Sequence, residues 1–180
     1  MIVTTKELLK EGETQYSIKQ KIINKKIILI RRGIYSFDNE NYISEGYICR
    51  KYPNVVITGI SAFSIYNLTD YIPKMIYVAS RQHSYPINMK EIKQSYQSNR
   101  FFDVGVTTIS LNKEEIRIYD LERLLIELIR LKESYPKDLY YDVLESFRKI
   151  KHTLDFYKIS EYARNFNNPS LLLNKIKELI

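Results

Sequence analysis

The residues with the clearest potential for chemistry are two adjacent arginines, Arg31 and Arg32, which are followed by Gly33. They stand between two short apolar runs, residues 27–30 and 34–37, which predict a β-hairpin whose turn uses the positive φ that glycine allows. Guanidinium groups at a hairpin tip have little to pack against, but they suit the phosphates or the narrow minor groove of DNA. We therefore expect a wing that contacts a polyanion.

A short helix over residues 14–23, capped by Thr14, is expected directly before this hairpin. Ile18 and Ile22 lie four residues apart and predict its buried face. On the opposite side, glutamine can bond adenine at two points in a major groove, and lysine and serine can reach phosphates or base edges. An ordinary solvated helix face has the same composition, so the helix alone leaves both interpretations open. The candidate DNA-reading side chains are Tyr16, Ser17, Lys19 and Gln20.

An earlier helix is predicted to begin after Thr4, with Glu7 completing a capping box, and to end near residue 10. Leu8 and Leu9 are expected to face inward, and Gly12 to supply a left-handed C-cap. Two short helices joined by a three-residue turn with glycine are typical of a helix-turn-helix.

Charge separates this region from the rest of the chain. The 180 residues carry a net charge of +7, of which residues 1–37 hold +5, with eight basic and three acidic side chains. Residues 38–180 hold twenty basic and eighteen acidic side chains, or +2. A clustered positive charge is expected of a polyanion binder, although a solvated basic surface would look the same. We predict a winged-helix head over residues 1–38 and a body over residues 39–180.

The pattern of the body predicts an α+β fold with a small, mostly antiparallel sheet and C-terminal helices. Cys49 is expected to be a buried apolar residue, and Ser61 to be the N-cap of a short helix. Strands are predicted over residues 55–58, 75–79, 91–98, 104–111 and 116–119. Helices are predicted over residues 41–52, 61–66, 121–132, 137–149, 153–166 and 169–180.

The main polar cluster of the body is Asp120, Glu122 and Arg123, where the last predicted strand meets a helix. Asp120 is expected to cap this helix by accepting backbone N–H bonds. We expect Arg123 to pair with Asp120 or with a carboxylate on a neighbouring element. A structural role is favoured for the three residues, and the alternative is an interaction surface.

Catalytic patterns are not found. The two histidines, His83 and His152, are 69 residues apart, and no spacing typical of metal ligands or of a phosphate-binding glycine loop occurs. We expect no catalytic residue, no metal and no cofactor, and we predict that the protein is not an enzyme. No segment has the apolar length of a membrane span, and a single cysteine is consistent with a reducing cytoplasm.

Several fragments, taken in order, resemble the bacterial AbiEi-type antitoxins of abortive-infection toxin–antitoxin systems. They are RRGIYSF after two short helices, VVITGISAFSIYNLTDYIPKMIYVAS, IRIYDLERLLIELIR, and residues 158–164 with their Tyr162-Ala163 pair. The resemblance covers essentially the whole chain. Leu124 stands where the family often has threonine, and Glu127 where aspartate is common. That family also has a further helix before the one that begins at Thr4, so we expect the core of this head to be completed by the body or by a second subunit.

The resemblance implies a transcriptional repressor that binds inverted repeats in its own promoter through a winged helix. It also implies a body that neutralises a nucleotidyltransferase-like toxin without forming a stable complex with it. The basic positions that it implies as DNA contacts are Lys19, Lys21, Lys25, Lys26, Arg31 and Arg32.

Three functions are therefore weighed. The favoured one is a repressor and antitoxin, which would present two heads to a two-fold operator, either as a dimer or as two monomers side by side. The second is a protein-interaction module that sequesters a toxin directly, with no major role in binding DNA. The third, an enzyme that acts on nucleic acid, would need two or more carboxylates and a lysine converging on a metal.

Overall fold

The computed structural model describes residues 2–37 and 43–180, which form two compact units, Met1–Lys51 and Tyr52–Ile180. The boundary falls after α3 (Glu45–Lys51) and not after residue 38, where the sequence placed it. Arg50 of α3 donates a hydrogen bond to the carbonyl of Ile2, and its Nε lies 3.4 Å from Oε1 of Glu7. These contacts tie α3 to the first unit, so a helix that follows the hairpin contributes to that unit.

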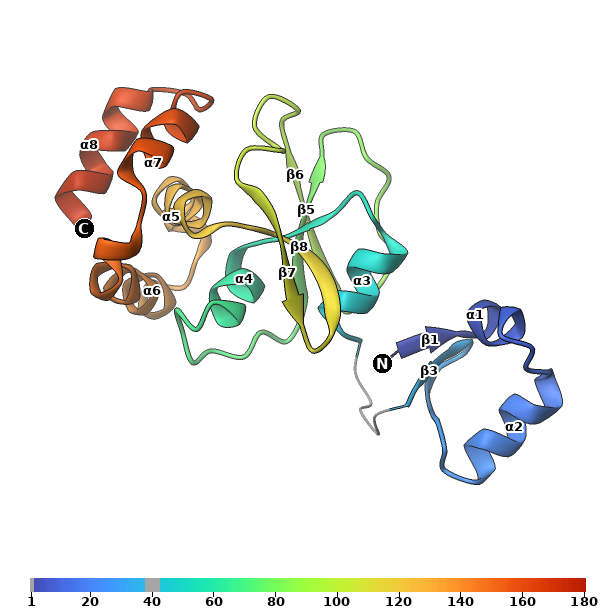
Figure 1. Cartoon of the computed structure of the whole chain (residues 1–180). Coiled ribbons are helices and arrows are strands. Elements are labelled where there is room, and N and C mark those ends of the chain that lie inside the picture. The colour runs from blue at the N-terminus through green and yellow to red at the C-terminus, as the bar shows by residue number, and fades with distance from the viewer. Residues whose placement is uncertain (1, 38–42) are drawn as a thin grey trace. The chain divides into compact units, whose positions relative to one another are not determined.

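The first unit is a three-stranded antiparallel sheet with two helices between its first and second strands (Figure 1). The strand order is β1-β3-β2, so that the first strand pairs with the last. Besides α3, the elements of this unit are β1 (Ile2–Thr4), α1 (Thr5–Lys10), α2 (Gln15–Ile23), β2 (Ile28–Arg31) and β3 (Ile34–Ser36).

One core cluster of this unit draws its side chains from β1, α1, α2 and β3 and from Ile27, the residue before β2. The buried residues of this cluster are Val3, Leu8, Ile18, Ile27 and Tyr35, with Ile22 packed against them. Leu8 is fully buried as expected, but the prediction for Leu9 was wrong, since its side chain is 43% exposed. Adjacent helical residues point about 100° apart, so a two-turn helix on a small core buries one of the two leucines.

Both helices begin at the predicted caps. The Thr4 hydroxyl accepts from Glu7 N, while the Glu7 carboxylate accepts from Thr4 N, which confirms the capping box. Thr14 caps α2 in the same way, with Ser17 in place of a glutamate. Gly12 has a φ of +89°, as a left-handed turn between the helices requires.

The second unit is built on a five-stranded sheet whose order is β6-β5-β4-β8-β7. The sheet is mixed, which corrects the prediction of a mostly antiparallel one: β4 pairs with β8 and β5 with β6 in parallel, whereas the other two pairings are antiparallel. Alternation of apolar residues marks a strand but not the direction of its partner. The strands are β4 (Val56–Ile57), β5 (Ile76–Arg81), β6 (Ile92–Gln97), β7 (Val106–Leu111) and β8 (Glu114–Tyr119).

Helices pack against this sheet and against one another, with α5 in contact with α4, α6, α7 and α8 (Figure 1). Eight of the ten residues of α5 are buried, which makes it the central helix of the unit. None of the helices in the described part of the chain is long and apolar enough to cross a membrane. The helices are α4 (Gly59–Ile65), α5 (Leu121–Arg130), α6 (Lys137–Lys149), α7 (Phe156–Ala163) and α8 (Pro169–Leu179), with short 3-10 turns η1 (Lys132–Ser134) and η2 (Lys151–Thr153).

Three predictions on the helices have clear outcomes. Cys49 is buried, as expected. Ser61 does not cap a helix: α4 begins two residues earlier, and the buried Ser61 hydroxyl accepts a hydrogen bond from Tyr77 N at 2.9 Å. Ser61 therefore joins α4 to β5. The predicted helix over residues 41–52 is observed as α3, and residues 41 and 42 lie outside the described residues.

We predict that Gly105→Ala destabilises the protein by about 3 kcal/mol, since a left-handed alanine costs about 1–2 kcal/mol and overpacking a similar amount. Gly105 has a φ of +75°, and a Cβ there would lie 2.5 Å from Cβ of Arg123. Gly12→Ala is the matched control, with a φ of +89° and nothing within 4 Å of the added Cβ. Urea unfolding should show a loss of only about 1 kcal/mol for the control. Equal losses in the two variants would contradict the tight packing at Gly105.

Candidate functional site

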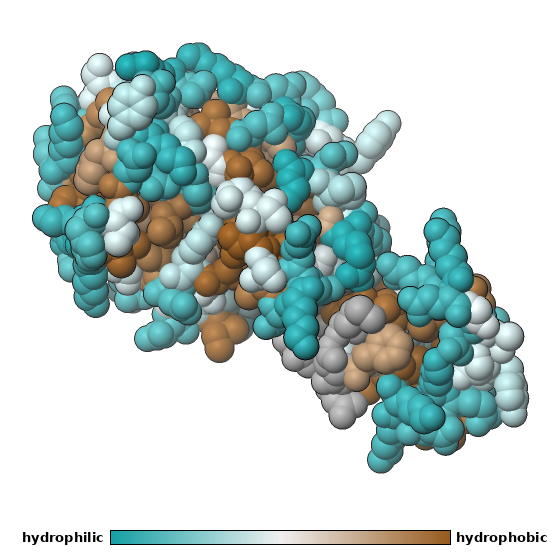
Figure 2. Space-filling view, viewed as in Figure 1, coloured by the Kyte–Doolittle hydropathy of each residue, from teal (hydrophilic) through white to brown (hydrophobic). Residues whose placement is uncertain are grey.

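Two groups of polar residues stand out, one in each unit. In the first unit, the sides of α2 and of the hairpin that do not face the core carry most of the predicted DNA-binding residues. Tyr16 is 72% exposed, Lys19 is exposed, and Gln20 is half-buried. Figure 2 shows mostly hydrophilic residues on the visible surface over α2. Opposite them, Ile18 is buried in the core, so the predicted division of the helix into two faces is confirmed.

Ser17 and Lys21 are held by an acidic neighbour, Glu13. The Ser17 hydroxyl donates to Oε2 of Glu13 at 2.6 Å, and Lys21 Nζ forms an ion pair with Oε1. Hydrogen bonds from Lys21 and then from Ser17 lower the pKa of Glu13 from its ordinary value, so the carboxylate stays charged. Ser17 also closes the helix cap with Thr14. Both side chains are therefore held by Glu13, which precedes α2, whereas no such contact holds Lys19.

The end of α2 presents two further lysines in a strained turn. Lys25 N–H donates to Ile22 O at 3.0 Å, and Lys26 N–H donates to Lys21 O at 2.8 Å, which is the hydrogen-bond pattern of a Schellman C-cap. Lys25 occupies the left-handed position, with a φ of +54°, that glycine normally fills. Both lysines are exposed, so the turn displays two ammonium groups between α2 and β2.

The hairpin has the predicted form. Gly33 adopts a φ of +80° at its turn, and its carbonyl accepts from Thr5 N at 3.0 Å, which ties the turn to the start of α1. Arg32 is exposed at the turn, while Arg31 is the last residue of β2 and is half-buried. One small sheet thus fixes α2 and this basic turn together.

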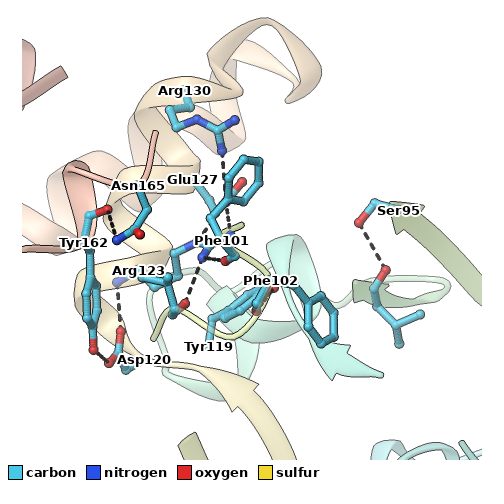
Figure 3. Close-up of polar contacts among 12 residues, drawn as sticks. Ser95, Phe101, Phe102, Tyr119, Asp120, Arg123, Glu127, Arg130, Tyr162 and Asn165 are labelled. Carbon is cyan, nitrogen blue, oxygen red and sulfur yellow. Dashed lines mark hydrogen bonds and ion pairs between the residues drawn. The ribbon is translucent and has the colours of Figure 1, made fainter. Parts of the chain in front are cut away.

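In the second unit, the polar cluster is centred on a fully buried guanidinium, that of Arg123 (Figure 3). Its Nε donates to Oε1 of Glu127 at 2.9 Å, and its Nη1 donates to the carbonyls of Phe101 and of Val104, the latter at 2.8 Å. Its Nη2 lies 2.7 Å from the same Glu127 oxygen, but without hydrogen-bond geometry. The expectation that Arg123 pairs with Asp120 or with another element is corrected: its carboxylate partner lies one turn along the same helix.

Aromatic rings surround this guanidinium. Its carbon atom Cζ lies 4.3 Å from the ring centroid of Tyr119 and 4.8 Å from that of Phe166. Phe101 packs against Phe166 with their ring centroids 4.6 Å apart. Arg123 is thereby excluded from solvent, which leaves it a structural role and makes it unsuitable as an exposed interaction residue.

Asp120 and Glu122 form a second, less buried network with α7. Asp120 Oδ1 accepts from Arg123 N at 2.9 Å, which confirms the predicted cap, and Oδ2 accepts from the hydroxyl of Tyr162 and from Lys158 Nζ, each at 2.8 Å. Glu122 accepts from Asp155 N at 3.1 Å and lies 3.3 Å from Lys158 Nζ. Both carboxylates thus anchor α7, Glu122 at its start and Asp120 along its length.

The electrostatics of this network favour a structural role over catalysis. The hydrogen bond to Asp120 raises the pKa of Lys158 above its usual range, so the amine stays protonated. Burial, followed by the hydrogen bond to Asp120, raises the pKa of Tyr162 to about 12. A nucleophilic amine or a general base needs the opposite shift. Within the described residues, no three His, Cys, Asp or Glu side chains are placed to hold a metal ion.

The role of Lys158 was missed by the sequence prediction, and Glu127 was noted there only as a departure from the resembled family. The i, i+4 spacing of Arg123 and Glu127 was the available signal for that pair. No comparable signal existed for Lys158, because it reaches Asp120 from 38 positions away in the sequence.

No family model and no curated protein matches the sequence. Among solved structures, the chain is similar to the crystal structure of the RV2827C protein from Mycobacterium tuberculosis, with a TM-score of 0.64. The alignment covers 98% of this chain and 72% of that chain at 13% sequence identity. A likeness at this identity concerns the fold, and it supports the α+β architecture described above.

We predict that Glu127→Leu destabilises the protein by about 3–5 kcal/mol, because it leaves the guanidinium of Arg123 buried without its carboxylate. The double variant Arg123→Met with Glu127→Leu should lose less than the sum of the two single variants, as measured by urea unfolding. The control is Glu145→Leu, which breaks an exposed pair with Arg148 and should cost less than about 1 kcal/mol. Strict additivity of the two core substitutions would argue against the ion pair.

Proposed function

We propose that the protein is a cytoplasmic DNA-binding transcriptional repressor of its own operon, and that it also acts as the antitoxin to a nucleotidyltransferase-like toxin. The observation that carries the proposal is the arrangement of the first unit. Its small sheet and core hold a helix with exposed polar side chains, a turn with two exposed lysines, and a basic hairpin turn. Helix-turn-helix proteins place such a second helix in the major groove, and basic side chains beside it position the backbone phosphates.

The charge of the unit agrees with this interpretation. Of the three acidic side chains in residues 2–37, Glu7 is bound to Thr4 and Arg50, and Glu13 to Ser17 and Lys21. Lys25 and Lys26 are not among the partners of these two acids. The expected contacts are Tyr16, Lys19, Gln20, Lys25, Lys26, Arg31 and Arg32, with Ser17 and Lys21 at the edge.

The antitoxin part of the proposal rests on the resemblance to AbiEi-type antitoxins and concerns the second unit. The pKa shifts of Lys158 and Tyr162 argue against acid–base work at its most polar cluster, which is consistent with a role in binding. The proposed partners are inverted repeats in the promoter and a toxin neutralised without a stable complex. A two-fold operator would require two first units about 34 Å apart, or multiples of that spacing.

We predict that the full-length protein shifts DNA from immediately upstream of its own gene, and that Arg31→Ala with Arg32→Ala weakens this binding. Loss of two phosphate contacts should lower the slope of log affinity against log salt concentration by about 2. The control is Lys175→Ala with Lys177→Ala, which removes the same charge from exposed positions of α8. If the wild-type protein does not shift this DNA, the repressor proposal is wrong. A stable complex with the neighbouring toxin would then favour the protein-interaction module.

We predict that Lys25→Gly raises stability while it lowers DNA affinity. Glycine removes the cost of about 1 kcal/mol for a left-handed lysine, but it also removes one phosphate contact and about one unit of salt slope. Lys25→Ala removes the same charge but keeps a side chain in the left-handed conformation. It should therefore lose as much DNA affinity as Lys25→Gly, without the gain in thermal stability. Unchanged affinity in both variants would remove Lys25 from the interface.

A further inference from the structure

Strand β7 forms one edge of the five-stranded sheet and lacks the usual protection against pairing with another strand. Its sequence, VTTISL, contains no charged residue and no proline, and most of its residues are β-branched. Edge strands in natural proteins are normally protected by charges, proline, a bulge or a short length. The pairing of β7 with β8 runs over the whole strand without a register shift, so a bulge does not protect it either.

The other sheet edges carry such protection. Strand β6, at the opposite edge, has the exposed Lys93, and its Gln94 side chain binds the preceding loop by accepting from Ile87 N at 2.7 Å. In the first unit, β2 has a register shift between Leu29 and Arg31, and β1 is only three residues long. Among the described strands, β7 is therefore the edge that remains open.

The hairpin turn shows which backbone groups of β7 are available. Asn112 and Lys113 have φ values of +50° and +66°, as a two-residue type I′ turn between β7 and β8 requires. The residues that flank such a turn form a hydrogen-bonded pair, and the direction of the backbone groups alternates along the strand. The N–H and C=O groups of Thr108 and Ser110 therefore point away from β8. Within the described residues, no hydrogen bond reaches them from another element.

These groups match those of a second copy related by a two-fold axis. If Ile109 of each copy lies on the axis, Thr108 N–H would donate to the carbonyl of the partner's Ser110, and the partner's Ser110 N–H to the carbonyl of Thr108. The axis repeats both bonds, so every available group of the two residues is paired. A register centred on Thr108 would instead need Val106 N–H, which already donates to Asp103 O at 3.3 Å.

The side chains of β7 fit the same arrangement. Ile109 lies opposite Ile116 on one face of the sheet, where Ile116 is fully buried but Ile109 only partly so. Pairing would place the two copies of Ile109 side by side and continue this apolar face across the axis. On the other face, the exposed Thr108 would meet the partner's Ser110, a hydroxyl pair that favours antiparallel strands. Neither strand brings a charge to the contact.

We propose that the protein self-associates by antiparallel pairing of β7 with β7 of a second copy, which joins the two five-stranded sheets into one. The contact is smaller than the about 800 Å² per partner of a stable interface, so the dimer is weak, with a dissociation constant of about 10–100 μM. The inference rests on the second unit and does not require the proposed function. A repressor on a two-fold operator would gain two linked first units from this dimer.

The first test is sedimentation equilibrium of the full chain at concentrations from about 5 to 500 μM, which bracket a weak contact. A monomer–dimer equilibrium is expected. Its dissociation constant should change less than about threefold between low and high salt, because β7 is uncharged. A chain that stays monomeric throughout would overturn the proposal. So would an association that weakens more than about tenfold in high salt, since that would indicate contact between charged surfaces.

Variants of β7 test the edge itself. Ser110→Pro removes an N–H that faces solvent in the monomer, so it should keep the fold and abolish the dimer. Thr108→Lys places a charge at the contact and should weaken the dimer about tenfold or more. The matched control is Tyr96→Lys, at an exposed position of β6, which should leave the dissociation constant unchanged. Circular dichroism melting establishes that each variant is folded. Full dimerisation of both β7 variants, or equal weakening by the control, would reject the interface.

Cross-linking tests the register. Residues opposite each other in a non-hydrogen-bonded pair have Cα atoms about 4.5 Å apart, which a disulfide can span. Ile109→Cys should therefore form a disulfide-linked dimer on mild oxidation, whereas Tyr96→Cys on β6 should not. The native Cys49 is buried and is common to both variants. Linkage of Thr108→Cys but not of Ile109→Cys would contradict the register, and no linkage at either position would overturn the pairing of β7 with itself.

Discussion

The Arg123 guanidinium is completely buried, and much of the second unit is arranged to accommodate it. Glu127 supplies the opposite charge, and the carbonyls of Phe101 and Val104 accept from Nη1. A charge removed from water is costly unless its donors are satisfied, so these partners must hold their positions together. The guanidinium therefore joins α5 to the segment before β7, and Phe166, which packs against it, extends the same cluster past α7. The packing around Arg123 also requires a glycine at position 105, because no side chain fits between the Gly105 backbone and Arg123.

The first unit is governed by a different constraint, which is its small size. Among the described residues, the core cluster under α1 and α2 has five buried residues, and these two helices have six and nine residues. Helices of this length are marginal by themselves, so the capping boxes at Thr4 and Thr14 and the packing of Leu8 and Ile18 on the sheet are needed. Arg50 brings a third helix to this unit.

The charged residues discussed in the two units differ in whether they are paired with an opposite charge or exposed to solvent. In the second unit, the charges of Asp120, Glu122 and Lys158 are paired with one another across α5 and α7. In the first unit, the turn after α2 leaves Lys25 and Lys26 exposed, and Lys25 does so in an unfavourable backbone conformation. A lysine where glycine would be more stable is consistent with selection for something other than stability. This contrast is the reason that we propose a binding role for the first unit and a structural role for the cluster at Asp120.

The sequence by itself determined the features that depend on near neighbours in the chain. The caps at Thr4, Thr14 and Asp120 were predictable because a cap joins residues three positions apart, and the hairpin was predictable because its turn requires Gly33. The buried face of α2 followed from the spacing of Ile18 and Ile22. Only the tertiary structure decided the parallel pairing of β4 with β8, the contribution of α3 to the first unit, and the joining of Lys158 to Asp120. Those contacts join residues far apart in the chain, and what selects them is the burial of a shared core and of its charges, which no local pattern records.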